Sequence, residues 1–247
     1  MAAAASCHSV EMLLRASVGG ATMRALSRLS HFLSGSPRNP VHALHLVVAE
    51  VAPSGLGAPG AACDAVLEAM TAVEASDLGV GSDAAAAAAA ATGRRSEVWH
   101  VPIAETAAYS ICIFILGPNA SIPLHDHPGM TVLSKVLRGS VTATSFDVVE
   151  ALAGGRVRAA PSATTAAAPA TLALFPDAKN VHEFVAGPEG VAILEVLSPP
   201  YDAGDGRDCH YFRVVTEDAK GDDVLLEAYP CPDDFCCLGA PYTGSAP

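Results

Sequence analysis

The feature of this sequence that most restricts its fold is a series of seven short apolar runs after residue 95, with no helical pattern between them. Each run is rich in Val, Ile, Leu, Thr or aromatic residues, and Gly, Pro, Asn or Asp separate it from the next, which is typical of β-strands joined by turns. Seven such strands in succession predict a β-sandwich or a small barrel. The runs are SEVWHVPI, YSICIFIL, TVLSKVLRGSVTATSFDVV, ATLALF, HEFVA, GVAILEVL and CHYFRVV.

The first third of the chain has a different pattern. Residues 64–80 predict an amphipathic helix, whereas residues 42–52 fit a helix or a buried strand, and residues 9–33 suggest two short helices. We therefore expect a small helical region over residues 1–80, a low-complexity linker over residues 81–95 and a β domain over residues 96–247. Within that domain, residues 151–170 are expected to form an inserted loop between two strands.

Charge and cysteine content restrict the partners and the compartment. The net charge of -12 argues against nucleic acid and anionic membranes as partners, and no run of strongly apolar residues is long enough to cross a membrane. The seven cysteines include no C-x-x-C pair, which favours a reducing cytoplasmic location and, in our interpretation, a monomer. A mitochondrial location is the alternative, because Glu11 is the sole acidic residue before residue 50 and stands against four arginines.

Two histidines one residue apart, His125 and His127, are the first candidates for chemistry. On a strand, residues i and i+2 point to the same face, so the two imidazoles would project together, either as a hydrogen-bonded pair or as two ligands of a metal. His182 follows 55 residues later at the start of another predicted strand and offers a third ligand. By the same alternation Asp126 and His210 face away and are interpreted as structural or surface residues.

The arrangement resembles the cupin barrel, whose motifs supply H-x-H, then a glutamate and a glycine, and later a histidine after a proline. Gly139 and Pro176 match that pattern, but no carboxylate stands near Val132, where the glutamate is expected. Further stretches, SIPLHDHPGM, KVLRGSV, NVHEFVA, LEVLSPPYDAGDGRDCHYFRV and DDFCCLGAPYTG, closely resemble the cysteamine (2-aminoethanethiol) dioxygenase family, which includes the plant cysteine oxidases. The resemblance extends from about Trp99 to Gly244.

This resemblance implies a cupin-type double-stranded β-helix, or jelly-roll barrel, with a helical N-terminal extension. It also implies an Fe(II) ion held by His125, His127 and His182, which adds dioxygen to a thiol and yields a sulfinic acid. The implied substrates are cysteamine, the N-terminal cysteine of peptides, or both, and oxidation of N-terminal cysteines would allow a role in oxygen sensing. The alternatives are another metal-dependent cupin enzyme and a regulatory cupin without catalysis.

The same resemblance names residues around the metal. Glu195 stands where the family generally carries aspartate, and it would orient a ligand or meet the substrate amine; an ordinary strand-end hydrogen bond is the alternative. Tyr201 would donate a hydrogen bond to bound oxygen or else be a core tyrosine. Cys209 and Tyr211 match a pair associated with a thioether cross-link, with simple packing as the alternative.

Overall fold

The computed structural model describes residues 39–92, 97–217 and 223–247. Its helices are α3 (Pro40–Val51), α4 (Ala61–Thr71) and α5 (Ala84–Thr92), with the 3-10 turns η1 (Ala52–Ser54) and η2 (Ala203–Asp205). Its strands are β1 (Val98–Glu105), β2 (Ser110–Leu116), β3 (Ser121–His125), β4 (Thr131–Leu152), β5 (Arg156–Ala167), β6 (Ala170–Leu174), β7 (Val181–Ser198), β8 (Tyr211–Glu217), β9 (Val224–Tyr229) and β10 (Cys237–Gly239).

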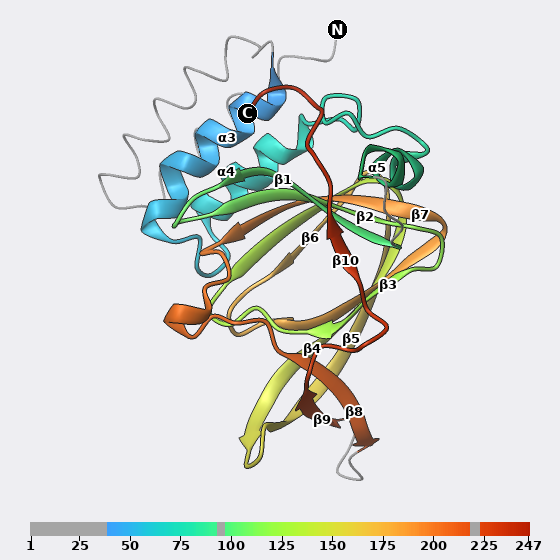
Figure 1. Cartoon of the computed structure of the whole chain (residues 1–247). Helices are drawn as coiled ribbons and strands as arrows, with labels where there is room; N and C mark the ends of the chain where they lie inside the picture. The colour runs from blue at the N-terminus through green and yellow to red at the C-terminus, as the bar shows by residue number, and fades with distance from the viewer. Residues whose placement is uncertain (1–38, 93–96, 218–222) are drawn as a thin grey trace, which may run out of the picture.

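Six of these strands close into a barrel (Figure 1). Antiparallel pairing runs from β7 through β3, β8, β9, β5 and β4 and returns to β7. Strands β2, β1 and β10 extend the sheet from the second half of β7, and β6 pairs with the first half of β4. The prediction of a mainly β chain that forms a barrel is therefore confirmed.

The two long strands β4 and β7 hold the barrel together, because their pairing closes the sheet on itself. They lie side by side along most of their length, and the pairing register shifts beside Gly139. Gly139 has φ 71°, and a Cβ at this position would overlap the carbonyl oxygen of Gly190, which also has a positive φ. Glycine is therefore required where the two strands bend together.

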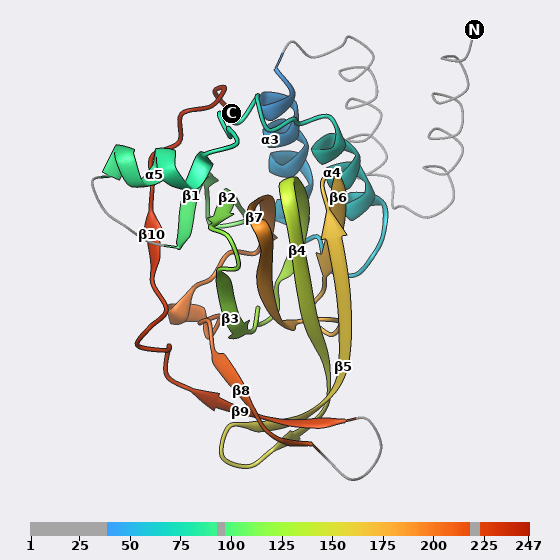
Figure 2. The same ribbon diagram turned by 90° about the vertical axis from the view of Figure 1, so that its right-hand side faces the viewer.

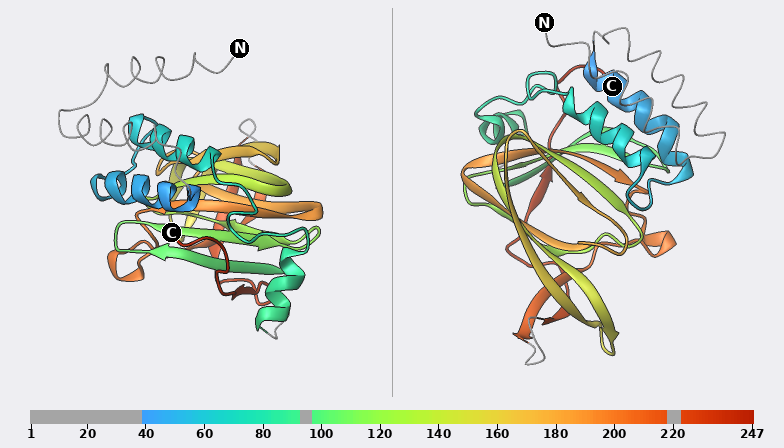
Figure 3. Two further views of the ribbon diagram at one scale, coloured as in Figure 1. Left: turned by 90° about the horizontal axis from the view of Figure 1, so that it is seen from above. Right: turned by 180° about the vertical axis from the view of Figure 1, so that it is seen from behind.

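Side-chain alternation separates an outer face from the barrel interior. In β2, Ile111 and Ile113 pack in the cluster that contains α3 and α4, whereas Cys112 lies in a different cluster with Met130 and Val132. Helices α3 and α4 thus cover the outside of the sheet formed by β1, β2, β7 and β4, as the rear view shows (Figure 3). The strand period of two explains how one apolar run serves both faces, because its isoleucines meet the helices while Cys112 and Phe114 face the interior.

Two polar contacts attach the helices to the barrel and to the tail. Lys135 on β4 is 4% exposed, and its Nζ donates to the carbonyl oxygens of Thr71 (2.9 Å) and Val73 (2.7 Å) at the end of α4. A cation there satisfies carbonyls that a helix end leaves without partners. Asn39 caps α3 through its side-chain oxygen, and its Nδ2 donates to the carbonyl of Ala246, so the tail ends beside α3 (Figure 1).

Two segments differ from the expectation. Residues 151–170, expected to be an inserted loop, instead form the end of β4, a turn at Gly154 and Gly155, and β5, which pairs with β4 over its whole length. The start of β5 pairs with β9 at the lower end of the barrel (Figure 2). The alanines lack strand propensity, but cross-strand pairing outweighs it, and Ala159 and Ala166 are buried.

The expected linker also contains structure, because the alanine run forms α5, in accord with the high helix propensity of alanine. Residues 42–52, which fitted either a helix or a strand, belong to α3 and η1. The helices expected over residues 9–33 lie outside the described residues, as does the arginine-bearing N-terminus. Among the described helices, none has the length and apolarity needed to span a membrane.

Candidate metal centre

Three buried histidines meet inside the barrel. His125 ends β3, His182 is the second residue of β7, and the two are direct cross-strand partners. His127 lies beyond the end of β3, in a turn that the Met130 N–H closes by donating to the His127 carbonyl. The ring centroids are 4.7 Å, 4.8 Å and 5.0 Å apart. The turn, rather than strand alternation, therefore brings His127 beside His125.

The nitrogen positions fit a single metal ion. The Nε2 atoms of His127 and His182 are 2.9 Å apart, and one ligand atom from each of the three histidines lies within 4.8 Å of the others. Two nitrogens bound at right angles to one ion, each at about 2.1 Å, would be separated by about 3.0 Å. The three rings thus form a metal-ligand set. Among the described residues, no carboxylate or thiol joins this cluster as a fourth ligand.

Hydrogen bonds on the far side of two rings select the tautomer that a metal needs. The Nδ1 of His125 is 2.8 Å from the Pro123 carbonyl, which can only accept, so Nδ1 carries the proton and Nε2 keeps its lone pair. The hydroxyl of Tyr201 donates to the Asp126 carbonyl (2.7 Å) and accepts from Nδ1 of His127 (2.8 Å). Nε2 of His127 is left for the metal by the same reasoning.

Burial keeps the imidazoles neutral. Burial lowers the pKa of His125 to about 4, and it holds the pKa values of His127 and His182 well below the ordinary value. The neighbouring imidazoles add to this effect, because a second positive charge would be costly there. The site therefore offers three neutral lone pairs rather than cations.

Asn180 fixes the turn that carries His127, and the sequence analysis missed it. Its Oδ1 accepts from the His127 N–H (3.0 Å), and its Nδ2 donates to the His127 carbonyl (2.8 Å) and to that of Phe175. The side chain thus pairs with both backbone groups of one ligand residue. The available signal was its position two residues before His182, in a loop that otherwise lacks side-chain amides.

Glu195 is buried on the neighbouring part of the barrel interior. It is 3% exposed, it lies across from Ser134 on β4 and Cys112 on β2, and its Oε1 accepts from the Ser134 hydroxyl at 2.9 Å. Burial raises the pKa of this carboxyl to about 7, and the Ser134 hydrogen bond lowers it in part. The group therefore changes charge near neutral pH, which is the range useful for proton transfer.

Cys209 and Tyr211 approach the histidines from the start of β8. The Tyr211 ring centroid is 6.4 Å from that of His125, and the Cys209 thiol is in hydrogen-bond contact with the hydroxyls of Tyr201 and Tyr211. Cys209 is a free thiol in this structure, and burial raises its pKa to about 11. The two residues are thus adjacent without a covalent bond between them.

The hydroxyl of Tyr201, expected either to face bound oxygen or to be satisfied in the core, has partners within the protein. Its proton is directed to the Asp126 carbonyl, and the ring stacks on His127 with centroids 5.2 Å apart. Asp126 itself points away from the histidines, as predicted, and its carboxylate accepts from the backbone N–H and Nδ1 of His210. These contacts attach the metal-ligand turn to the segment that carries Cys209 and Tyr211.

Comparison with known proteins places this site in a family. The PCO_ADO family model matches residues 69–246. The chain is 36% identical over 183 residues to human 2-aminoethanethiol dioxygenase, covering 60% of this chain and 67% of that protein. It is 42% identical over 126 residues to plant cysteine oxidase 1 of Arabidopsis thaliana, covering 47% of this chain and 43% of that protein.

A similar match is a probable 2-aminoethanethiol dioxygenase of Dictyostelium discoideum, with 33% identity over 152 residues, covering 60% of this chain and 68% of that protein. Among solved structures, a double-stranded β-helix protein from Klebsiella pneumoniae aligns with a TM-score of 0.33 and 20% identity, covering 43% of this chain and 82% of that chain.

Proposed function

Because the chain belongs to the PCO_ADO family, we propose that it is a thiol dioxygenase acting on cysteamine, on the N-terminal cysteine of peptides, or on both. The reaction joins a thiol, R–SH, with O2 to give a sulfinic acid, R–SO2H, so that both oxygen atoms end on sulfur. The observation that carries the proposal is the cluster of three neutral histidines with no carboxylate in it among the described residues. Such a ligand set leaves positions open for a thiolate and for oxygen.

We propose Fe(II) as the metal, held by His125, His127 and His182. A ferrous ion in this position would bind the thiol and dioxygen side by side and exchange electrons with them. The donor set fits, because imidazole nitrogens suit iron and the rings present their free nitrogens to one point. Tyr201 and Asn180 hold His127 in the required orientation, and the Pro123 carbonyl does the same for His125.

We assign Glu195 a role in proton transfer. Both substrates carry an amine two carbons from the sulfur, and the thiol must lose its proton to bind as thiolate. A carboxyl with a pKa of about 7 is able to take that proton or to pair with the substrate ammonium. The Ser134 hydroxyl fixes Oε1, which leaves the carboxylate a defined orientation. Cys209 and Tyr211 are proposed to form the wall beside His125, whether or not a thioether joins them.

The direct test measures oxygen consumption by the iron-loaded protein with cysteamine and with a peptide that begins with cysteine, and mass spectrometry of the products. A product heavier by two oxygen atoms is expected. The variant His182→Ala should lose metal and turnover together, whereas His42→Ala, an exposed histidine on α3, should match the wild type. Absence of turnover with iron, or turnover that His182→Ala leaves intact, would refute the proposal.

Two further properties are proposed with the function. Five described cysteines, Cys63, Cys112, Cys209, Cys231 and Cys237, are free thiols, which agrees with a cytoplasmic enzyme in a reducing compartment, and we propose that it acts as a monomer. A role in oxygen sensing requires a Michaelis constant for oxygen within or above the cellular range. Oxygen-dependence of the initial rate measures it, and saturation at trace oxygen would exclude sensing.

A further inference from the structure

A cavity of about 490 Å³ opens on the flank of the barrel, beside the candidate metal centre. We call it the flank cavity. Strands β1 and β3 form one side of it, and the segment that follows β9 forms the other. Its volume lies within the range of small-ligand sites and is sufficient for the side chain of a lysine or an arginine. The lining residues are Glu97, Val98, Ser121, Pro123, Tyr229, Pro232, Asp234, Phe235 and Cys236.

The flank cavity is linked to the metal centre through two contacts. The carbonyl of Pro123, which lines the cavity, bonds the ring of His125 at 2.8 Å. The Tyr211 ring lies between the two sites, with centroid distances of 6.4 Å to His125 and 6.0 Å to Phe235. Phe235 is thus within about 12 Å of His125, and an extended peptide advances about 3.3 Å per residue. A peptide with its cysteine at the metal centre reaches the cavity about three residues later.

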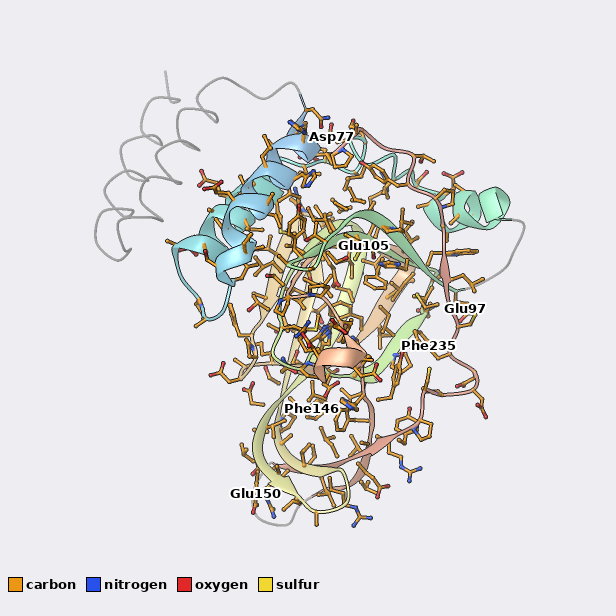
Figure 4. The ribbon with its side chains drawn as sticks, turned by 60° about the vertical axis from the view of Figure 1, so that its left-hand side comes forward. Asp77, Glu97, Glu105, Phe146, Glu150 and Phe235 are labelled. Carbon is orange, nitrogen blue, oxygen red and sulfur yellow. The ribbon has the colours of Figure 1, made fainter. Side chains whose placement is uncertain are left out.

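The chemistry of the lining selects positive charge. Glu97 and Asp234 are both exposed to solvent at the rim, and the cavity lining contains no lysine or arginine from the described parts of the chain. Glu97 and Phe235 lie on the same flank of the barrel (Figure 4). The rings of Tyr229 and Phe235 add aromatic faces, which attract cations as well as apolar stems.

Arg213 shows that an aromatic ring of the cavity lining contacts a guanidinium group within the protein. Arg213 lies over the Tyr229 ring, 5.8 Å from its centroid, on β8 next to β9. Its charge is paired with Glu227 at 2.7 Å, so it does not neutralise Glu97 or Asp234 directly. Burial raises the pKa of Tyr229, and the negative charge of Asp234 adds to this effect. Among the described residues, no lysine or arginine forms an ion pair with Glu97 or Asp234.

We propose that the flank cavity binds a lysine or arginine side chain located about three residues after the N-terminal cysteine of a peptide substrate. The inference rests on the proposed function, because it takes the thiol of that peptide to be bound at the three histidines. It goes further by naming a second point of contact and the charge it selects. Cysteamine is too short to reach the cavity, so its turnover is independent of this contact.

The test uses peptides that begin with cysteine and carry lysine, glutamine or glutamate at position 3, 4 or 5 among glycines. Two readouts are needed, the Michaelis constant for oxidation and the dissociation constant of fluorescent peptides bound to the iron-loaded protein without oxygen. At low ionic strength we expect lysine at the best position to lower both constants about fivefold relative to glutamine, which is the range for two exposed ion pairs. Glutamate should raise them, and 0.5 M salt should remove most of the difference, since screening at about this concentration is strong.

Matched variants locate the effect. The double variant Glu97→Gln with Asp234→Asn should lose the lysine preference, whereas Glu189→Gln, an exposed carboxylate in the β7 turn, should retain it. Equal constants for the lysine and glutamine peptides, or a preference that the double variant keeps, would overturn the cavity proposal. Lysine-dependent binding without any oxidation of peptides or cysteamine supports the cavity and refutes the dioxygenase function instead.

Discussion

Replacement of Tyr201 by phenylalanine separates two roles for its hydroxyl group. In the structure this hydroxyl accepts from Nδ1 of His127 at 2.8 Å and donates to the Asp126 carbonyl at 2.7 Å. Burial holds the pKa of Tyr201 well above its ordinary value, so the hydroxyl keeps its proton at any physiological pH. Tyr201→Phe removes these two hydrogen bonds and the contact of the hydroxyl with the Cys209 thiol, and it leaves the ring in place against His127.

The expected loss of iron affinity follows from Nδ1–H of His127, which loses its acceptor in Tyr201→Phe. A buried N–H without an acceptor costs about 1–3 kcal/mol, and that cost applies to the one ring orientation in which Nε2 of His127 faces the metal. A cost of this size weakens binding by roughly 5- to 150-fold, which overlaps the 10- to 100-fold losses typical of residues that orient metal ligands. We therefore expect Tyr201→Phe to bind Fe(II) about 10-fold or more weakly, with activity partly restored at high iron.

The assay is competition for Fe(II) against a coloured chelator without oxygen, followed by the rate of cysteamine oxidation as a function of added iron. Tyr109→Phe is the matched control, because it removes a buried hydroxyl that contacts His45 at 2.8 Å, remote from the histidine cluster. Unchanged iron affinity in Tyr201→Phe together with a collapse in turnover that iron does not restore would refute this reasoning. It would assign the hydroxyl to the substrate or to oxygen, as the sequence interpretation held.

Three further predictions concern the barrel around the site. Glu195 has a pKa of about 7 in the folded chain and an ordinary value of 4.5, so this group alone makes stability fall as pH rises through that window, by about 3 kcal/mol. The buried histidines, whose pKa values are lowered, act in the opposite direction, so the quantity to measure is the difference between the wild type and Glu195→Gln in denaturant unfolding at pH 4.5 and 8. The stability of the wild type relative to Glu195→Gln should fall by about 3 kcal/mol between these pH values, and an unchanged difference would contradict the prediction. Ser134→Ala removes a hydrogen bond that lowers the pKa of Glu195, and should move the corresponding limb of the pH–rate profile to higher pH. An unshifted profile would show that the rate does not depend on the protonation of Glu195. Lys135→Met leaves two carbonyls at the end of α4 without their donor and should lower the free energy of unfolding in urea by about 2–3 kcal/mol. Lys179→Met, at an exposed lysine, should change it little, and similar losses in both variants would contradict a special role for Lys135.

The strand content and the three histidines were predictable because both are carried by local sequence patterns. Runs such as YSICIFIL are short, continuously apolar and rich in β-branched residues, which favours buried strands, and the mainly β barrel follows. Residues 151–170 failed this reasoning because an alanine-rich strand is stabilised by partners elsewhere in the chain, here β4 and β9. Local propensity does not report on such partners.

The surroundings of the histidines were less predictable, for a related reason. The carbonyl of Pro123 and the two backbone contacts of Asn180 involve groups that every residue or any loop amide possesses. Ser134 and Glu195 are 61 residues apart in the sequence, and the pairing register of β4 and β7 places them opposite each other. No local sequence pattern predicts that register. The identity of the ligands could be taken from spacing, but the tautomer and orientation of each ring required the three-dimensional fold.

The distribution of charge explains why a site of this kind suits a thiolate. Asp126, which stands between two of the ligand histidines in the sequence, is turned toward His210, and Glu195 is held by Ser134 on the neighbouring strand β4. Neither carboxylate joins the histidine cluster, and all three imidazoles are kept neutral by burial. A divalent ion bound there would keep its whole charge for the incoming sulfur, which lowers the pKa of the thiol. A carboxylate ligand would cancel part of that charge, so the missing acid near Val132 is the feature that favours thiol chemistry over the reactions of cupins with four ligands.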